Sequence, residues 1–141
     1  MIAFNDNWKF VFVCTEAFLR GEGEGEKVRL PHTVRQLPPH YIDRGQYETR
    51  AGYRNTFMLT PEQAAERVFL QFDGAQHTLE VFVNGEPAGR HACGYTAARI
   101  EITDLIRPGE NRVAVRLSTF EENIPPFGFA IDYLGYGGLC R

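Results

Sequence analysis

The sequence predicts an all-β fold in which two antiparallel sheets pack face to face. In segments 68–72, 79–83 and 113–117, every second residue is Val, Leu or Phe, and Gln71, Glu80 and Arg116 stand at intervening positions. A period of two with one apolar face is typical of half-buried antiparallel strands. Asn84-Gly85 and Pro108-Gly109 supply turn residues between such segments. About eight or nine short strands separated by turns are typical of a β-sandwich.

The N-terminal half has weaker strand patterns. Segment 8–14 is apolar and predicts the first strand, and segment 21–26 alternates Gly and Glu and predicts a loop or hairpin tip. Segment 27–30 predicts a short strand and segment 53–59 a further one. Between them, residues 31–52 have few periodic apolar positions, which predicts a long irregular loop. Loops of this length inside a compact domain are often functional.

One short helix is expected in this otherwise β-rich chain. Thr60 has the side chain of a helix N-cap, Pro61 follows it and Gln63 stands three residues after the cap. This arrangement is typical of a capping box with proline in the first turn. Only three residues remain before the next strand pattern, so we expect a single turn.

Length and charge restrict the classes of function. A chain of 141 residues is the length of one domain, and its net charge of −3 without a block of like charges argues against nucleic-acid binding. The sequence contains no apolar run of about 18 residues and no leader-like start, so neither a membrane partner nor secretion is expected. Cys14, Cys93 and Cys140 lack metal or redox spacing and predict reduced thiols in a cytoplasmic protein.

No catalytic, metal-binding or cofactor-binding constellation is predicted. His91 and Cys93 are only two residues apart, but the other histidines do not form a ligand-spaced pair. Glu121-Glu122 is unsuited to glycoside hydrolysis, because adjacent residues of a strand point to opposite faces. Ser118 lacks the sequence of a nucleophile elbow.

Short motifs in a fixed order extend over nearly the whole chain. They are Leu30-Pro31-His32, Tyr53-Arg54 with Phe57, Phe72-Asp73-Gly74, Val83-Asn84-Gly85, Gly94-Tyr95-Thr96 and the tail from Asp132 to Arg141. Together they resemble the N-terminal sugar-binding domain of glycoside hydrolase family 2, which includes β-galactosidases, β-glucuronidases and β-mannosidases. Ala97-Ala98 and Cys140 depart from the family pattern and suggest local changes in packing.

The resemblance implies both a fold and a role for one residue. The fold would be a jelly-roll sandwich, and residues 1–141 would form a single domain excised from a larger, homo-oligomeric enzyme, most simply a β-galactosidase. The catalytic glutamates of the family lie on another domain, so this chain would be non-catalytic and would bind a β-galactoside or related β-glycoside only as part of that enzyme. Asp132 would reach the active site and bind sugar hydroxyls. Without the resemblance, Asp132 reads as a loop residue that caps a turn.

Two other functions are compatible with the residues. A standalone carbohydrate-binding module would use aromatic side chains such as Tyr95, Phe127 and Tyr133, although Trp8 lies in a predicted strand and is expected in the core. A purely structural or oligomerisation domain would not use Asp132 to bind a sugar.

Overall fold

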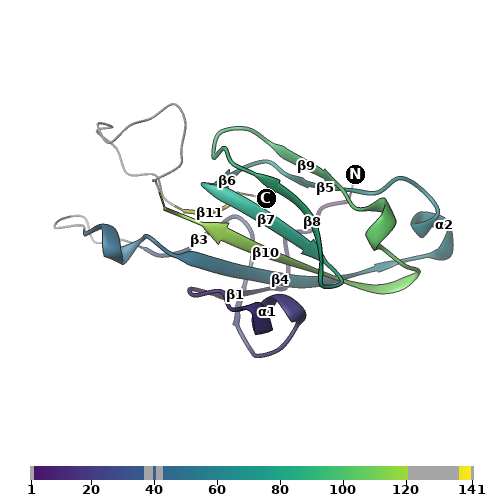
Figure 1. The fold of residues 1–141 in the computed structure, drawn as a ribbon, viewed down its shortest axis with the longest axis horizontal. Coiled ribbons are helices and arrows are strands. Elements are labelled where there is room, and N and C mark those ends of the chain that lie inside the picture. The colour runs from purple at the N-terminus through teal and green to yellow at the C-terminus, as the bar shows by residue number, and fades with distance from the viewer. Residues whose placement is uncertain (1, 37–39, 41–42, 121–136, 141) are drawn as a thin grey trace.

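The computed structural model describes residues 2–36, 40, 43–120 and 137–140, and they form a β-sandwich (Figure 1). One layer is a six-stranded sheet with the order β2-β1-β4-β10-β7-β8. Its strands are β1 (Trp8–Val11), β2 (Glu26–Val28), β4 (Arg50–Leu59), β7 (Thr78–Val83), β8 (Glu86–His91) and β10 (Gly109–Ser118).

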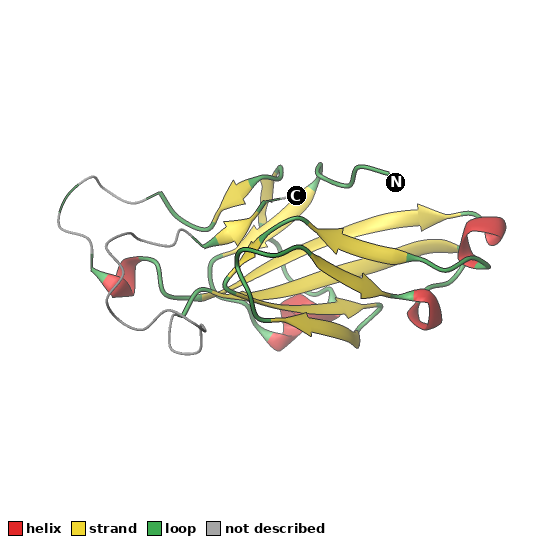
Figure 2. Ribbon diagram, turned by 90° about the horizontal axis from the view of Figure 1, so that it is seen from above, coloured by secondary structure: helices red, strands yellow, loops and turns green. Residues whose placement is uncertain are grey.

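Two smaller sheets form the facing layer (Figures 1 and 2). One has the order β3-β11-β6, and the other pairs β5 with β9. Their strands are β3 (His32–Thr33), β5 (Phe69–Phe72), β6 (Ala75–Gln76), β9 (Ala98–Glu101) and β11 (Gly138–Leu139). All the strand pairs of the described residues are antiparallel, which confirms the predicted all-β, jelly-roll type of sandwich.

The described residues contain eleven strands, more than the eight or nine expected. The difference comes from β3, β6 and β11, which have two residues each and are too short to show an alternating pattern. The expected irregular loop over 31–52 is wrong at both ends, because β3 begins at His32 and β4 begins at Arg50. Pairing with β10, not local alternation, makes Arg50–Gly52 a strand.

The predicted helical turn is confirmed as α2 (Pro61–Ala64). The Thr60 hydroxyl accepts a hydrogen bond from the Gln63 amide at 3.2 Å, and the Gln63 side-chain oxygen accepts one from the Thr60 amide at 2.9 Å. Two 3₁₀ turns, η1 (Arg44–Gln46) and η2 (Thr103–Leu105), are also present. In the part of the chain described here, the helices are all too short or too polar to cross a membrane.

A second helix, α1 (Glu16–Arg20), was not expected from the sequence. The Thr15 hydroxyl caps its start by accepting from the Phe18 amide at 3.1 Å, and Gly21 ends it with a φ of 103°. The Phe18 ring lies against Gly52 on the outer face of β4, where a Cβ would approach the ring to 2.9 Å. Gly52 thus makes room for α1 on the sheet.

Arg54 joins this helix to the sheet. Its guanidinium donates hydrogen bonds to the carbonyl oxygens of Phe18, Glu22 and Gly23, and it lies 4.5 Å from the centre of the Phe18 ring. Carbonyl groups at a helix C-terminus lack partners inside the helix, and a cation there is stabilising. Arg54 therefore holds both α1 and the start of the Gly/Glu segment on the outer face of β4.

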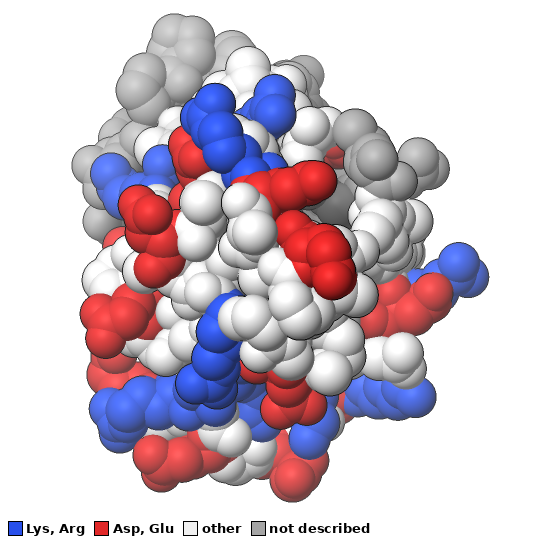
Figure 3. Space-filling view, turned by 90° about the vertical axis from the view of Figure 1, so that its right-hand side faces the viewer, with Lys and Arg blue, Asp and Glu red and all other residues white. Residues whose placement is uncertain are grey.

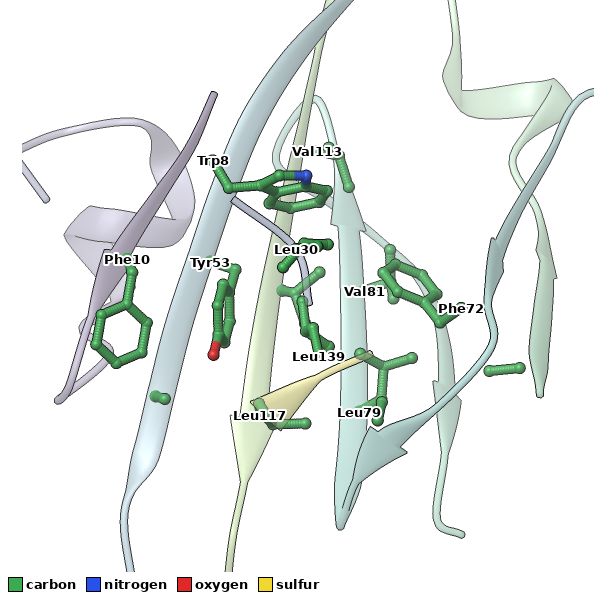
Figure 4. Packing of buried hydrophobic residues seen from close by; sticks show 14 of the residues in the cluster. Trp8, Phe10, Leu30, Tyr53, Phe72, Leu79, Val81, Val113, Leu117 and Leu139 are labelled. Carbon is green, nitrogen blue, oxygen red and sulfur yellow. The ribbon is translucent and has the colours of Figure 1, made fainter. Parts of the chain in front are cut away.

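The space between the layers is filled by one apolar cluster (Figure 4). The alternating residues of β7 and β10 that the sequence placed inward are at most 1% exposed, which confirms their predicted face. They are Leu79, Val81, Val83, Val113, Val115 and Leu117. Trp8 and Tyr53 add large buried rings, and Leu139 of β11 closes the cluster from the facing layer.

A buried amide network fixes the turn between β7 and β8. Asn84 and Gly85 have φ angles of 53° and 92°, as a tight hairpin turn requires. The Asn84 amide group donates to the Asn111 side-chain oxygen at 2.9 Å, and its own oxygen accepts from the Arg112 amide at 3.0 Å. Asn111 is fully buried and also bonds both backbone groups of Arg107. The network joins the hairpin turn to the start of β10.

Replacing Asn111 with Ala is expected to lower the free energy of unfolding by about 2–4 kcal/mol, because a fully buried side chain is lost together with its hydrogen bonds to Arg107, Gly109 and Asn84. Urea unfolding followed by tryptophan fluorescence measures this change. Glu110→Gln, an exposed neighbour on the same strand, is the control and should change the value by at most about 0.5 kcal/mol. Equal, small effects of both substitutions would show that the network does not stabilise the fold.

Candidate functional site

The predicted sugar-binding residue, Asp132, lies outside the described residues. So do Glu121-Glu122 and the predicted aromatics Phe127 and Tyr133. The described chain stops at Phe120 and resumes at Gly137, and we call Thr119 and Gly137, which lie next to these two points, the anchors. The site is therefore described from these two anchors.

Thr119 anchors the exit from β10. Its side chain is fully buried, and its hydroxyl donates to the Tyr47 carbonyl at 2.6 Å and accepts from the Thr49 amide at 2.7 Å. Its amide donates to the Thr49 carbonyl at 2.9 Å, which extends the pairing of β4 with β10 by one residue. These hydrogen bonds tie the end of β10 to residues 47–49.

Gly137 and β11 anchor the return. The Gly137 carbonyl accepts from the Val34 amide at 2.9 Å, and the Cys140 amide donates to the Gly74 carbonyl at 2.8 Å. Between them, β11 pairs with β3 on one side and β6 on the other. A Cβ on Gly137 would overlap the Thr119 methyl group, so exit and return are in direct contact.

Beside β11, an aromatic group surrounds His32 of β3. The His32 Nδ1 and the Tyr53 hydroxyl share a hydrogen bond of 3.0 Å, and the Phe10 ring centre is 4.6 Å from that of His32. Burial lowers the pKa of His32, an effect that the Glu26 carboxylate partly opposes, and burial raises the pKa of Tyr53. The neutral imidazole is therefore the form that this environment favours.

The Gly-Tyr-Thr corner lies after β8. His91 Nε2 and the Thr96 hydroxyl share a hydrogen bond of 2.9 Å, and the Thr96 hydroxyl and nearby backbone amides lower the pKa of Cys93. Tyr95 is 55% exposed. Cys14, Cys93 and Cys140 are all free thiols, and in the described part of the chain no three His, Cys, Asp or Glu side chains are placed to hold a metal ion.

Surface charge is mixed. On the face shown in Figure 3, acidic and basic side chains are interspersed. Ion pairs such as that of Arg67, two residues before β5, with Glu101 of β9, at 2.9 Å, join opposite charges on the surface. Such a surface does not generate the field of one sign that steers a polyanion.

Comparison with known protein families identifies the family of this chain. The family described as "Glycosyl hydrolases family 2, sugar binding domain" matches residues 28–125. The chain belongs to this family.

Relatives of this sugar-binding domain include two kinds of glycosidase. It is 35% identical over 140 residues to a β-galactosidase of Thermoanaerobacter pseudethanolicus, and 36% identical over 145 residues to a β-glucuronidase of Bacteroides fragilis. These alignments cover 97% and 99% of the chain but 18% and 19% of the relatives. The chain thus spans about a fifth of the length of these relatives.

A solved structure has the same fold. The crystal structure of a Bacteroides uniformis β-glucuronidase superimposes with a TM-score of 0.82 and 26% sequence identity, over 97% of this chain and 16% of that one. The antiparallel sandwich is therefore the arrangement that this region has in a larger glycosidase.

The anchor residues of the sugar-binding domain were not predicted from the sequence. Thr49 and Thr119 are buried threonines outside the quoted motifs, and 70 residues separate them. The available signal was a polar Ser118-Thr119 pair directly after the apolar alternation of β10. That pair alone does not show which backbone groups the side chains meet.

The stability of the domain should depend on pH through His32. Because burial lowers the folded-state pKa of His32, the unfolded state binds a proton more readily, and stability is lost as the pH falls below about 6.5 towards the folded-state value. Gln does not titrate and retains a polar group for Tyr53. The difference in unfolding free energy between wild type and His32→Gln should therefore be larger at pH 8 than at pH 5.

Chemical denaturation across this pH range measures the difference, and Tyr53→Phe tests the role of the shared hydrogen bond. A difference that stays constant with pH would contradict an effect of burial on the His32 pKa.

Proposed function

We propose that this sugar-binding domain is the non-catalytic N-terminal part of a larger, retaining β-galactosidase and that it supplies the Asp132 carboxylate to the bound sugar. The β-galactosidases among its relatives support this proposal, because two of them align with 97% and 100% of the chain. Each is about five times longer than this domain.

The chemistry of the site supports a role in binding rather than in bond cleavage. A carboxylate accepts two well-oriented hydroxyl hydrogen bonds, and bonds to a charged acceptor are stronger than neutral ones. Retaining hydrolysis needs two further carboxyl groups about 5–5.5 Å apart on either side of the scissile bond. A barrel of about 250 residues that carries them would fit within the remaining four fifths of such an enzyme.

The proposal includes the partners and location of the larger enzyme. Its sugar partner is a β-galactoside, the other domains of the same polypeptide pack against this one, and the enzyme assembles as a homo-oligomer in the cytoplasm. The length of the relatives supports further domains, and three free thiols fit a reducing compartment.

A β-glucuronidase is the second candidate, favoured by the Bacteroides fragilis relative and the Bacteroides uniformis structure. The two activities differ in substrate, since a glucuronide carries a carboxylate that a galactoside lacks. Parallel assays of the full-length enzyme on 4-nitrophenyl β-galactoside and β-glucuronide distinguish them. Turnover of the glucuronide alone would replace the first assignment with the second.

The 141-residue chain by itself is expected not to hydrolyse aryl β-glycosides above the buffer rate, because the carboxyl pair is proposed to lie elsewhere. Release of 4-nitrophenol measures this directly, and turnover would overturn the non-catalytic assignment. Calorimetric titration with galactose and lactose is the companion experiment. Millimolar or tighter binding would favour a standalone carbohydrate-binding module instead.

In the full-length enzyme, Asp132→Asn should lower kcat/KM about 100-fold, because the sugar hydroxyls lose a charged acceptor while the side chain keeps its size. Asp104→Asn is the matched control. Asp104 is exposed in η2, at the opposite end of β10 from Thr119, and its substitution should leave kcat/KM unchanged. Wild-type kinetics of Asp132→Asn would indicate a purely structural domain.

A further inference from the structure

We propose that the outer face of the six-stranded sheet around Arg112 and Met58 is a docking surface for another domain of the same polypeptide, which places a carboxylate on Arg112. This inference rests on the proposed function, because it places the sugar-binding domain in a longer enzyme. Arg112 is suited to the role because the described chain leaves its guanidinium group without an acceptor.

The Arg112 side chain packs against the end of α1 without bonding to it. A Cβ on Gly21 would overlap the Arg112 Nη1 atom and come within 2.7 Å of its Cζ atom, so the guanidinium group lies directly on the backbone of Gly21. The Arg112 Nε group is buried, and among the described residues it has no hydrogen-bond partner. Buried polar groups without a partner are rare, and they are most costly when they are charged.

Nearby acceptors are already bonded to other cations. Arg54 takes carbonyl oxygens at the end of α1 and in the segment that follows it. The Glu24 carboxylate pairs with Lys9 at 2.8 Å. Burial, and after it the charge of Arg112, lowers the pKa of Arg54, which shows that the two guanidinium groups repel each other. An acceptor from outside the described chain would offset this excess of positive charge.

The surface around Arg112 is partly apolar and uncovered. The helix α1 covers one part of the outer face, over Gly52. Beyond the helix, the exposed Thr56 of β4 pairs with Arg112, and Met58, two residues further along the same face, is 69% exposed. Phe82 of β7 is partly exposed on this face on the other side of β10. Methionine, phenylalanine and arginine are enriched in the residues that protein interfaces bury.

The occupant that fits these side chains is a carboxylate flanked by apolar residues. A carboxylate can accept two parallel hydrogen bonds from a guanidinium group, and the pair gains strength where a packed domain excludes water. Two of the aligned β-galactosidases are about five times longer than this chain, so a comparable enzyme has further domains to supply the carboxylate. A domain joined through the chain is present at a high effective concentration, which favours it over a second copy of the enzyme.

Met58 is a natural probe of this surface, because hydrogen peroxide converts accessible methionine to its sulfoxide. Peptide mass spectrometry measures the oxidation rate of Met58 in the full-length enzyme, both folded and unfolded in urea. The folded enzyme should oxidise Met58 about 10-fold more slowly than the unfolded enzyme, because the docked domain covers the side chain. An uncovered side chain that is 69% exposed should instead oxidise at close to the unfolded rate.

Arg112→Gln should raise the oxidation rate of Met58 in the folded enzyme at least about 3-fold, because the partner carboxylate loses its charged donor. Arg112→Lys keeps the charge but loses the planar fork, so it should raise the rate less. Arg99→Gln is the matched control. Arg99 is an exposed arginine of β9 in the facing layer, and its substitution should leave the oxidation of Met58 unchanged.

Oxidation of Met58 at the unfolded rate in the folded wild-type enzyme would overturn the docking surface. Equal rates in wild type and Arg112→Gln would overturn the role of Arg112. Protection that disappears on dilution would assign the surface to a second copy of the enzyme and overturn the choice of partner. If circular dichroism shows that Arg112→Gln does not fold, the wild-type rate and Arg112→Lys decide the same questions. These measurements use neither turnover nor Asp132, so a failure of the proposed function appears separately, in the kinetics of Asp132→Asn.

Discussion

The pairing of β4 with β10 is the interaction on which the rest of the domain depends. The two strands pair along ten residues, from Leu59 with Gly109 to Arg50 with Ser118, at the centre of the six-stranded sheet. The ladder satisfies the backbone groups of both strands, as their place inside the sheet requires. At one end of β10 the ladder reaches the Asn111 network, and at the other it continues into the hydrogen bonds of Thr119.

The inner face of this strand pair faces the apolar cluster, whereas only part of its outer face is covered, and Thr56 and Met58 are exposed there. Inward residues such as Tyr53 and Val115 enter the cluster between the layers. The helix α1 packs on outward residues of β4. Gly52 lies under the Phe18 ring, and Arg54 donates hydrogen bonds to carbonyl groups at the end of the helix. Arg54 is 7% exposed, and its charge is met by carbonyl dipoles and by an aromatic ring. A buried cation needs such partners, because desolvation otherwise costs more than packing returns.

The sequence patterns predicted those elements that depend on interactions between residues close together in the chain. The alternation of apolar residues predicted strands β7 and β10 and the faces that they bury. Asn84-Gly85 predicted the hairpin turn, and Thr60 predicted the capped turn of α2. The alternation did not predict the two-residue strands, because a period needs several residues, and the sequence patterns missed α1, although Thr15 and Gly21 cap that short helix locally. For the site, the tail motif predicted Asp132 by resemblance to the family, whereas Thr119 is recognisable only once residues 70 positions apart are in contact.

Some glycines of the motifs allow close approaches of the backbone. A Cβ on Gly138 would overlap the His32 carbonyl, and Gly94 packs so tightly on Gln76 that a Cβ would come within 2.9 Å of its side chain. Glycines at such positions constrain the backbone conformation, but they do not discriminate between sugar substrates. This explains how one domain sequence resembles both β-galactosidases and β-glucuronidases at similar identity. Within the proposed enzyme, this domain would supply the Asp132 carboxylate, and residues outside the domain would determine the specificity for the glycoside.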